Sequence, residues 1–242
     1  MHRLYCPSEI ISGTAIIIND RAQLHHLKDV LRLRPGEKVT ASDSKGNGYL
    51  CAAKELGRER IILEIIRRLP PEKKDFRLSI ACAIPQNSRF DDIVDKLTQL
   101  GVEKIIPLIT ERTIVKLTAE KSRQRLARWK KIALAASQQS QRGSLPVVEP
   151  VTEFRRLIAC SGGYDLKLIP ALLGKRRALK QILFLRKAKD ILALIGPEGD
   201  FTAQEAAFAR RAGFIPVSLG DNVLRVETAA IAVASYIALS AK

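Results

Sequence analysis

From residue 78 onward, the chain alternates short, uninterrupted apolar runs with longer amphipathic segments. The apolar runs occupy residues 78–84, 104–109, 166–170, 191–195 and 214–219. Apolar runs without polar alternation are typical of strands that are buried on both faces. Apolar residues at helical spacing between these runs predict helices that include 90–100, 118–142 and 228–239. The alternation predicts a mostly parallel α/β sheet, whose ligands bind at the carboxyl ends of the strands.

Residues 1–70 follow a different pattern, which is typical of a small β-rich domain. β-Branched or alternating runs predict strands at 14–19, 37–43, 48–56 and 60–66, and residues 23–33 have helical spacing. We therefore expect a compact barrel with one helix. Residues 67–75 contain two prolines and mixed charges without periodicity, which predicts a linker. The expected domains are residues 1–70 and 71–242.

The net charge of +16 narrows the range of partners. A strongly positive field favours polyanions such as nucleic acid or anionic lipid. Residues 112–131 hold eight basic residues against one acid, and residues 175–189 hold seven basic residues and no acid. A solvated helix face explains either run alone equally well, but two such runs in one chain favour RNA or DNA. The aromatic content of 5% argues against base stacking as the main binding mode.

Other features exclude several classes of protein. No apolar run is long enough to span a membrane, and the N-terminus lacks the apolar core of a signal peptide, so we expect a soluble cytoplasmic protein. The four cysteines are scattered, and the adjacent His25 and His26 would diverge on a helix, so we expect no metal site. The sequence also lacks the phosphate-binding loop of nucleotide hydrolases, the zinc-peptidase motif and the nucleophile elbow.

Two glycine turns stand at the ends of predicted strands. They are Gly196-Pro-Glu-Gly199 and Leu219-Gly220, and the second leads into Leu224-Arg-Val-Glu-Thr-Ala-Ala230. Such turns offer backbone N–H groups to a polar or anionic ligand, although an ordinary tight turn explains the first about equally well. Glu227 and Thr228 fit a helix start, as an acid that complements the dipole and a capping residue. Arg225 does not fit there unless an anion compensates it, which makes it a candidate functional residue.

Together with three earlier segments, these turns resemble the signature of the RsmE family, which methylates N3 of a uridine in small-subunit (16S) ribosomal RNA. The earlier segments are His25 to Arg32 with Pro35-Gly36, Arg89 to Val102, and Gln139 to Arg142 with Leu145-Pro146. The resemblance covers nearly the whole chain. It implies a PUA-like β-barrel domain at 1–70 and a SPOUT methyltransferase domain at 71–242. The latter would contain a C-terminal trefoil knot, bind S-adenosylmethionine and form a homodimer.

The resemblance also implies roles for individual residues. Arg225 would stabilise negative charge on the uracil or orient the base, and Glu227 would accept the N3 proton or hold Arg225. The residues expected to line the cofactor are Pro170, Ala171, Ile195, Gly196, Gly199, Leu219, Gly220, Leu224, Thr228 and Ala229. The expected partner is 16S rRNA or the small ribosomal subunit, with phosphates bound by the two basic runs. The residues expected to contact this RNA are Arg32, Arg89, Gln139 and Arg142.

Several positions depart from the family pattern, namely Asp200, Asp221-Asn222, Gln86, Gln99 and Gln138. Asp200 stands where a glycine is usual, and each glutamine stands where a charged residue is common. These departures bear on RNA contacts more than on the cofactor site. Two alternatives remain: a SPOUT methyltransferase acting on another RNA, and a non-catalytic RNA-binding factor for ribosome assembly. The intact glycine turns, Arg225 and Glu227 disfavour the second.

Overall fold

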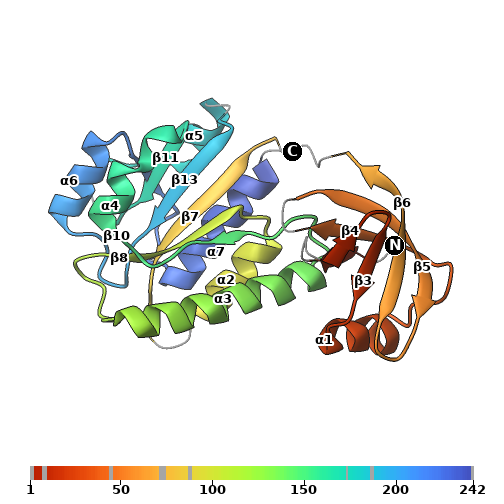
Figure 1. The fold of residues 1–242 in the computed structure, drawn as a ribbon. Coiled ribbons are helices and arrows are strands. Elements are labelled where there is room, and N and C mark those ends of the chain that lie inside the picture. The colour runs from red at the N-terminus through yellow and green to blue at the C-terminus, as the bar shows by residue number, and fades with distance from the viewer. Residues whose placement is uncertain are drawn as a thin grey trace. The chain divides into compact units, whose positions relative to one another are not determined.

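The computed structural model describes residues 3–6, 10–43, 46–70, 75–86, 89–172, 174–185 and 188–240. Its contacts divide the chain into two compact units (Figure 1). Unit 1 comprises Met1–Lys73 and Ser137–Leu145, and unit 2 comprises Lys74–Ala136 and Pro146–Lys242. The segment Ser137–Leu145 therefore belongs to the same unit as the N-terminal residues. The two expected domains, 1–70 and 71–242, did not include this return of the chain.

Unit 1 is built on a six-stranded sheet with the order β1-β4-β5-β6-β3-β2. β1 pairs with β4 in parallel, and the other neighbouring strands are antiparallel. Its strands are β1 (Arg3–Cys6), β2 (Ile11–Ser12), β3 (Ala15–Ile18), β4 (Lys38–Asp43), β5 (Gly48–Leu56) and β6 (Ile61–Leu69). β6 extends to Leu69, so the prediction of a linker was wrong for residues 67–69, while residues 71–74 lie outside the described part of the chain.

The predicted helix at 23–33 takes a different form. α1 (Arg21–His25) passes directly into the π-helical turn η2 (His26–Val30), and the chain leaves the helix at Arg32, whose φ is +51°. Leu24 and Leu27 are both buried in the core of unit 1. Only the first part of the predicted helix is therefore a regular α-helix.

Unit 2 contains a parallel sheet with the order β10-β8-β7-β13-β11-β14-β12, and β9 also pairs with β8. Its strands are β7 (Arg77–Ala83), β8 (Lys104–Ile109), β9 (Val147–Val148), β10 (Thr152–Glu153), β11 (Leu166–Pro170), β12 (Arg177–Ala178), β13 (Asp190–Ile195) and β14 (Ile215–Ser218). The five long apolar runs all form strands of this sheet. This confirms the predicted α/β class for unit 2.

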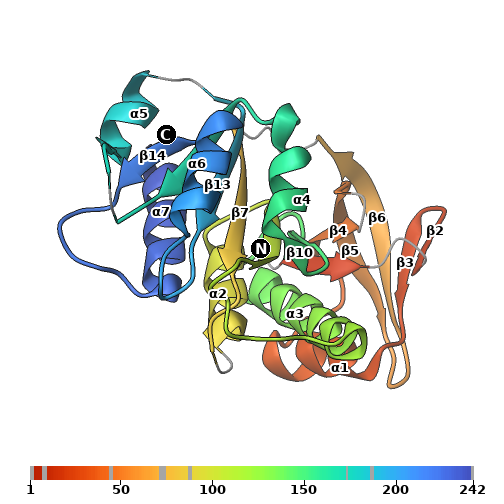
Figure 2. The same cartoon turned by 90° about the vertical axis from the view of Figure 1, so that its left-hand side faces the viewer.

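Helices cover both faces of the sheet (Figure 2). They are α2 (Arg89–Gln99), α3 (Ala119–Gln139), α4 (Phe154–Ala159), α5 (Leu179–Leu185), α6 (Ala203–Arg211) and α7 (Val226–Ser240), with a 3-10 turn η3 (Ser161–Gly163) after α4. Alternate residues of β13 enter different cores, since Ala193 packs with residues of α2 and α7 whereas Leu192 packs with residues of α4. Burial on both faces explains why the strand sequences are continuously apolar.

The starts of the helices differ in how they are capped. α6 begins with a capping box, because the Thr202 side chain accepts from the Glu205 N–H and the Glu205 carboxylate accepts from the Thr202 N–H. α7 begins at Val226, so the prediction that Thr228 caps it was wrong. Ser88, before α2, is of a residue type that often caps helices, and it lies outside the described residues. Within the described ranges, no helix combines the length and hydrophobicity needed to cross a membrane.

Candidate active site

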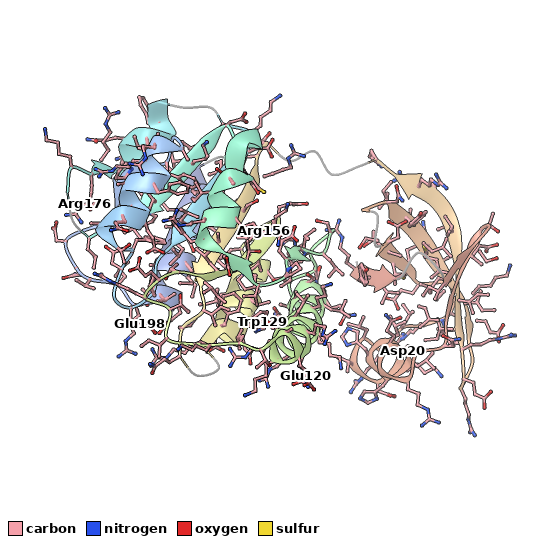
Figure 3. All side chains as sticks on the ribbon, turned by 60° about the vertical axis from the view of Figure 1, so that its left-hand side comes forward. Asp20, Glu120, Trp129, Arg156, Arg176 and Glu198 are labelled. Carbon is pink, nitrogen blue, oxygen red and sulfur yellow. The ribbon has the colours of Figure 1, made fainter. Side chains whose placement is uncertain are left out.

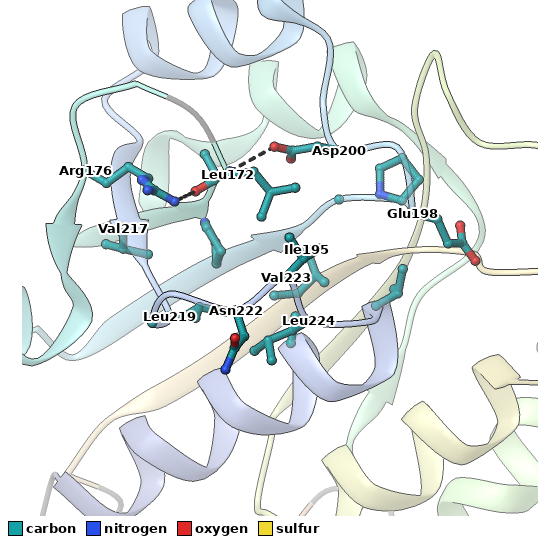
Figure 4. Close-up of a pocket in the computed structure, with 17 residues that line it drawn as sticks. Leu172, Arg176, Ile195, Glu198, Asp200, Val217, Leu219, Asn222, Val223 and Leu224 are labelled. Atoms are coloured by element: carbon teal, nitrogen blue, oxygen red, sulfur yellow. Dashed lines mark hydrogen bonds between the residues drawn. The ribbon is translucent and has the colours of Figure 1, made fainter.

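Three loops of unit 2 meet at one edge of the sheet and form a pocket (Figure 4). They follow β11, β13 and β14, which are neighbours in the sheet and parallel, so their carboxyl ends lie together. The pocket contains about 590 Å³ of space, counting its solvent-open mouth. The pocket lies at the position at which open α/β sheets bind ligands.

Most of the residues expected to hold a cofactor line this pocket. Those in the lining are Pro170, Ala171, Ile195, Gly196, Leu219, Gly220, Leu224 and Ala229. Gly199 and Thr228 are not among the lining residues. The Gly199 carbonyl accepts a hydrogen bond of 2.5 Å from Arg112 Nη1, and Thr228 is exposed in the first turn of α7. The structure thus brings together eight of the ten positions.

Two glycines in the lining are required by local geometry. A Cβ at Gly196 would lie 3.1 Å from Phe201 Cε2 and 3.3 Å from Asp200 Oδ1. Phe201 is buried and packs on Phe154, so it has little freedom to move away. Gly220 has a φ of +120°, which side-chain-bearing residues rarely adopt. Gly196 is therefore favoured by the lack of space beside it, and Gly220 by its backbone conformation.

Asp200, the departure that the sequence alone leaves unexplained, connects two walls of the pocket. Its φ is +58°, in the left-handed region that favours glycine. One carboxylate oxygen accepts from the Phe201 N–H at 2.8 Å. The other accepts from the Leu172 N–H at 3.0 Å, the bond that Figure 4 marks between the two loops. The aspartate therefore ties the loop after β13 to the loop after β11.

The first turn of α7 carries the residues expected to act on a substrate. Val226 and Ala229 line the pocket, while Arg225, directly before the helix, is exposed. Glu227 Oε1 lies 3.9 Å from Arg89 Nη1, at the start of α2. Glu227 Oε2 is buried and makes no hydrogen bond with any described residue. No ion pair joins Glu227 to Arg225 in the described part of the chain.

The surroundings of Glu227 also affect a neighbouring thiol. Cys82, at the end of β7, is fully buried. Burial raises the pKa of the Cys82 thiol far above its usual range, and the carboxylates of Glu227 and Glu198 raise it further. The thiol therefore stays protonated and is not a nucleophile at neutral pH.

Contacts between α2 and α3 anchor the first turn of α2. Asp91 accepts a hydrogen bond of 3.1 Å from Trp129 Nε1 and lies 2.5 Å from Arg128 Nη2. The ring of Trp129, which Figure 3 labels on α3, also packs on Phe90, with 4.5 Å between ring centroids. The first turn of α2, which begins at Arg89, is thereby anchored to α3 through Phe90 and Asp91.

The other residues expected to contact RNA belong to unit 1. Arg32 and Gln139 are exposed, and the backbone N–H of Arg142 donates to the Ser137 carbonyl at 2.9 Å. Arg3 Nη1 donates to the Gln141 carbonyl at 3.0 Å, which attaches this segment to β1. Arg89 alone among the four belongs to unit 2.

Comparison with known proteins shows the family to which this chain belongs. A family described as an RNA methyltransferase domain matches residues 72–238, and one described as an RNA methyltransferase PUA domain matches residues 18–66. The chain belongs to this RNA methyltransferase family. It is 32% identical to ribosomal RNA small subunit methyltransferase E of Synechocystis, over 92% of this chain and 72% of that protein. It is 28% identical to the protein of the same name from Bacillus subtilis, over 86% and 83% of the two chains.

Solved structures of RNA methyltransferases have the same fold. The crystal structure of a ribosomal RNA small subunit methyltransferase E from Neisseria gonorrhoeae, bound to S-adenosyl methionine, superposes with a TM-score of 0.81. The two chains are 33% identical, and the match covers 98% of this chain and 96% of that one. The relatives confirm the identification of the family from its motifs.

Sequence reasoning missed several residues that line the pocket of this RNA methyltransferase. Leu172, Arg176, Val217 and Val226 all contribute. Arg176 Nη1 donates to the Ala171 carbonyl at 3.0 Å, so it supports the same wall as Asp200 (Figure 4). Arg176 belongs to the second basic run, and its charge suggested contact with phosphate rather than support of a loop. Val217 lies within the predicted strand 214–219, near its carboxyl end, a position that could have identified it.

Proposed function

We propose that this chain is an S-adenosylmethionine-dependent methyltransferase that methylates N3 of a uridine in small-subunit (16S) ribosomal RNA. The observation that carries the proposal is the pocket at the carboxyl edge of β11, β13 and β14. It gathers eight of the expected cofactor residues, and the α7 turn that lines it also carries Arg225 and Glu227. Relatives that share the fold are ribosomal RNA methyltransferases by name, and one was crystallised with S-adenosyl methionine.

The lining of the pocket fits this cofactor. Leu219, Leu224 and Val217 form an apolar surface suited to a flat base, while the turns at Gly196 and Gly220 present backbone polar groups. This mixture of apolar wall and a few converging polar groups is typical of nucleoside-binding sites. S-adenosylmethionine supplies an electrophilic methyl group bonded to a sulfonium sulfur.

The protein must supply a proton acceptor for the uracil N3–H and a positive charge for the ring oxygens. The neutral N3–H nitrogen is a poor nucleophile, so its proton has to leave as the N–C bond forms. Loss of that proton places negative charge on O2 and O4 of the ring. Glu227 accepts the proton, since its buried Oε2 is an acceptor with no hydrogen bond to a described residue. Arg225 stabilises the charge on the ring oxygens, since its exposed side chain has no ion pair with Glu227 to compete for it.

Two substitutions test the proposal. Glu227→Gln keeps the shape of the side chain but cannot take the proton, and Arg225→Ala removes the cation. We expect both to lower kcat by a factor on the order of 10²–10³, with S-adenosylmethionine affinity unchanged in calorimetry. Arg211→Ala, an exposed arginine at the end of α6, serves as the control. Unchanged turnover in both active-site variants would refute these roles.

The substrate is tested by nucleoside mass spectrometry of rRNA from cells with and without the gene. We expect 3-methyluridine to disappear from 16S rRNA when the gene is absent. Loss from another RNA would favour a different substrate. Unchanged modification, together with no binding of S-adenosylmethionine, would favour a non-catalytic assembly factor.

We also propose that the enzyme is a cytoplasmic homodimer and that its C-terminal loops form a trefoil knot. The support for these properties is the resemblance to the RsmE family. Light scattering on the purified protein tests the dimer, and a monomer at micromolar concentration would contradict it.

A further inference from the structure

A second cavity of unit 2 shares a wall with the cofactor pocket. Ala171 and Asp200 line both spaces. The second cavity is open to solvent and contains about 900 Å³, counting its mouth. The small side chains of Ala203 and Ala206 on α6 line it and leave room beside the helix.

Three basic side chains from distant parts of the chain converge on this cavity. Arg112 follows β8, Lys175 follows β11 and Arg210 lies near the end of α6. Arg112 and Lys175 are the first members of the two basic runs, at 112–131 and 175–189. Folding therefore brings the starts of both runs to one place, which neither run shows by itself.

The charge in the cavity is positive despite the presence of Asp200. Both carboxylate oxygens of Asp200 already accept backbone N–H groups, from Leu172 and Phe201. Arg112 is held by the Gly199 carbonyl through Nη1, which leaves its other N–H groups free to bind an anion. Lys175 and Arg210 are exposed and have no salt bridge with a described residue.

We infer that this cavity binds a backbone phosphate of the RNA substrate, beside the pocket that holds the cofactor. The inference rests on the proposed function, because it names where the RNA of that reaction is held. A phosphodiester carries one negative charge, and its oxygens suit the fork of an arginine and the ammonium of a lysine. The site contacts no base edge, so it positions the RNA without reading its sequence.

Two double variants with the same change in net charge test the site. Lys175→Gln/Arg210→Gln removes two cations from the cavity and leaves Arg112, which also supports Gly199. Lys180→Gln/Arg211→Gln removes two exposed cations from α5 and α6 that do not line it. RNA affinity is measured by filter binding of a 16S rRNA fragment between 50 and 200 mM salt, and cofactor affinity by calorimetry.

We expect the cavity variant to lose about one unit from the slope of log K against log salt, which corresponds to one phosphate contact. The ratio of wild-type to variant RNA affinity should then fall about threefold between 50 and 200 mM salt. The control variant should keep most of the slope, and both should bind S-adenosylmethionine normally. Equal slope losses in the two variants would show a general field effect and overturn the inference.

A second arm separates RNA from small anions. Inorganic phosphate is titrated into wild type and the cavity variant while RNA binding is followed. Competition by phosphate in wild type and its loss in the variant would support the inference. Binding of phosphate with no change in RNA affinity would show a small-anion site and overturn it. If wild type fails to bind S-adenosylmethionine, the proposed function fails, whatever the RNA data show.

Discussion

Asp200 offers the sharpest test of how this pocket is held together. Its carboxylate accepts one N–H from Phe201 and one from Leu172, so it joins two loops that are far apart in the sequence. Its φ of +58° places a side-chain-bearing residue where glycine is favoured. Substitutions at this position can therefore separate the contribution of the two hydrogen bonds from the cost of the backbone conformation.

The expected changes in the free energy of unfolding follow from the hydrogen bonds and from the backbone conformation. Hydrogen bonds to a charged group contribute about 1.5–3 kcal/mol each, and the lower figure applies to a half-buried residue such as Asp200. Asp200→Ala loses both bonds and keeps the strained backbone, so unit 2 should lose about 3 kcal/mol. Asp200→Gly loses the same bonds, but glycine avoids a left-handed penalty of about 1–2 kcal/mol. Glycine also loses more conformational entropy on folding, which offsets about 0.5–1 kcal/mol of the relief from backbone strain. Asp200→Asn keeps one acceptor oxygen and should lose about half as much as alanine.

Urea unfolding followed by tryptophan fluorescence measures this series. Trp129 is the single tryptophan, belongs to unit 2 and is 1% exposed, so it reports the transition of the unit that contains the pocket. Asp221→Ala is the matched control, because Asp221 is an exposed aspartate in the neighbouring loop, and we expect a change within about 0.5 kcal/mol.

Calorimetry with S-adenosylmethionine completes the test. Both alanine and glycine at position 200 should weaken binding, and asparagine should restore part of the affinity. If Asp200→Gly matched wild type in both stability and affinity, the tie between the two loops would contribute nothing and the reasoning would be refuted.

Three other predictions follow from the structure. Gly196→Ala should destabilise unit 2 by about 1–3 kcal/mol and weaken cofactor binding, because the new Cβ meets the buried Phe201 ring; urea unfolding and calorimetry measure both effects. A thiol reagent should modify the exposed Cys160 first, since burial raises the pKa of Cys6 to about 12; mass mapping of the labelled protein identifies the site. Backbone N–H groups of Asp190 and Lys189 lower the pKa of Asp165, so its stabilising effect is present above its unfolded pKa and is lost as pH falls through the folded value. Asp165→Asn should therefore flatten the loss of stability below about pH 4, measured by thermal unfolding across pH.

Continuous apolar runs predict the central strands well because burial on both faces leaves little ambiguity. β8 and β11 begin and end where the sequence predicts. The two-residue strands β9, β10 and β12 were missed, because so short a segment has no periodicity to detect. α5 was missed for a different reason: its residues fall within the second basic run, where charge dominated the interpretation.

The sequence predicted the loops of the candidate site, but not the contacts between residues that are distant in the chain. Glycine turns at strand ends indicate a ligand edge, and parallel pairing brings those ends together. The bond from Leu172 to Asp200 depends instead on the position of two loops in space, and no local pattern encodes it. The same holds for Arg112 and Lys175, which meet in one cavity although α3, α4 and three strands separate them in the chain.

The ion pair between Glu227 and Arg89 bears on the roles that Glu227 and Arg225 have toward the uracil. From the sequence, Glu227 could serve either to hold Arg225 or to take a proton. The structure pairs it with Arg89 on α2, at 3.9 Å through Oε1. Oε2 is buried and has no hydrogen bond within the described part of the chain. A buried acceptor without a donor is costly, and a substrate N–H that reached it would remove that cost. Arg225 is unfavourably placed at the positive end of α7 until an anion arrives. A uracil that gives its N3 proton to Glu227 and develops charge on its oxygens satisfies both residues, which favours separate roles over a mutual ion pair.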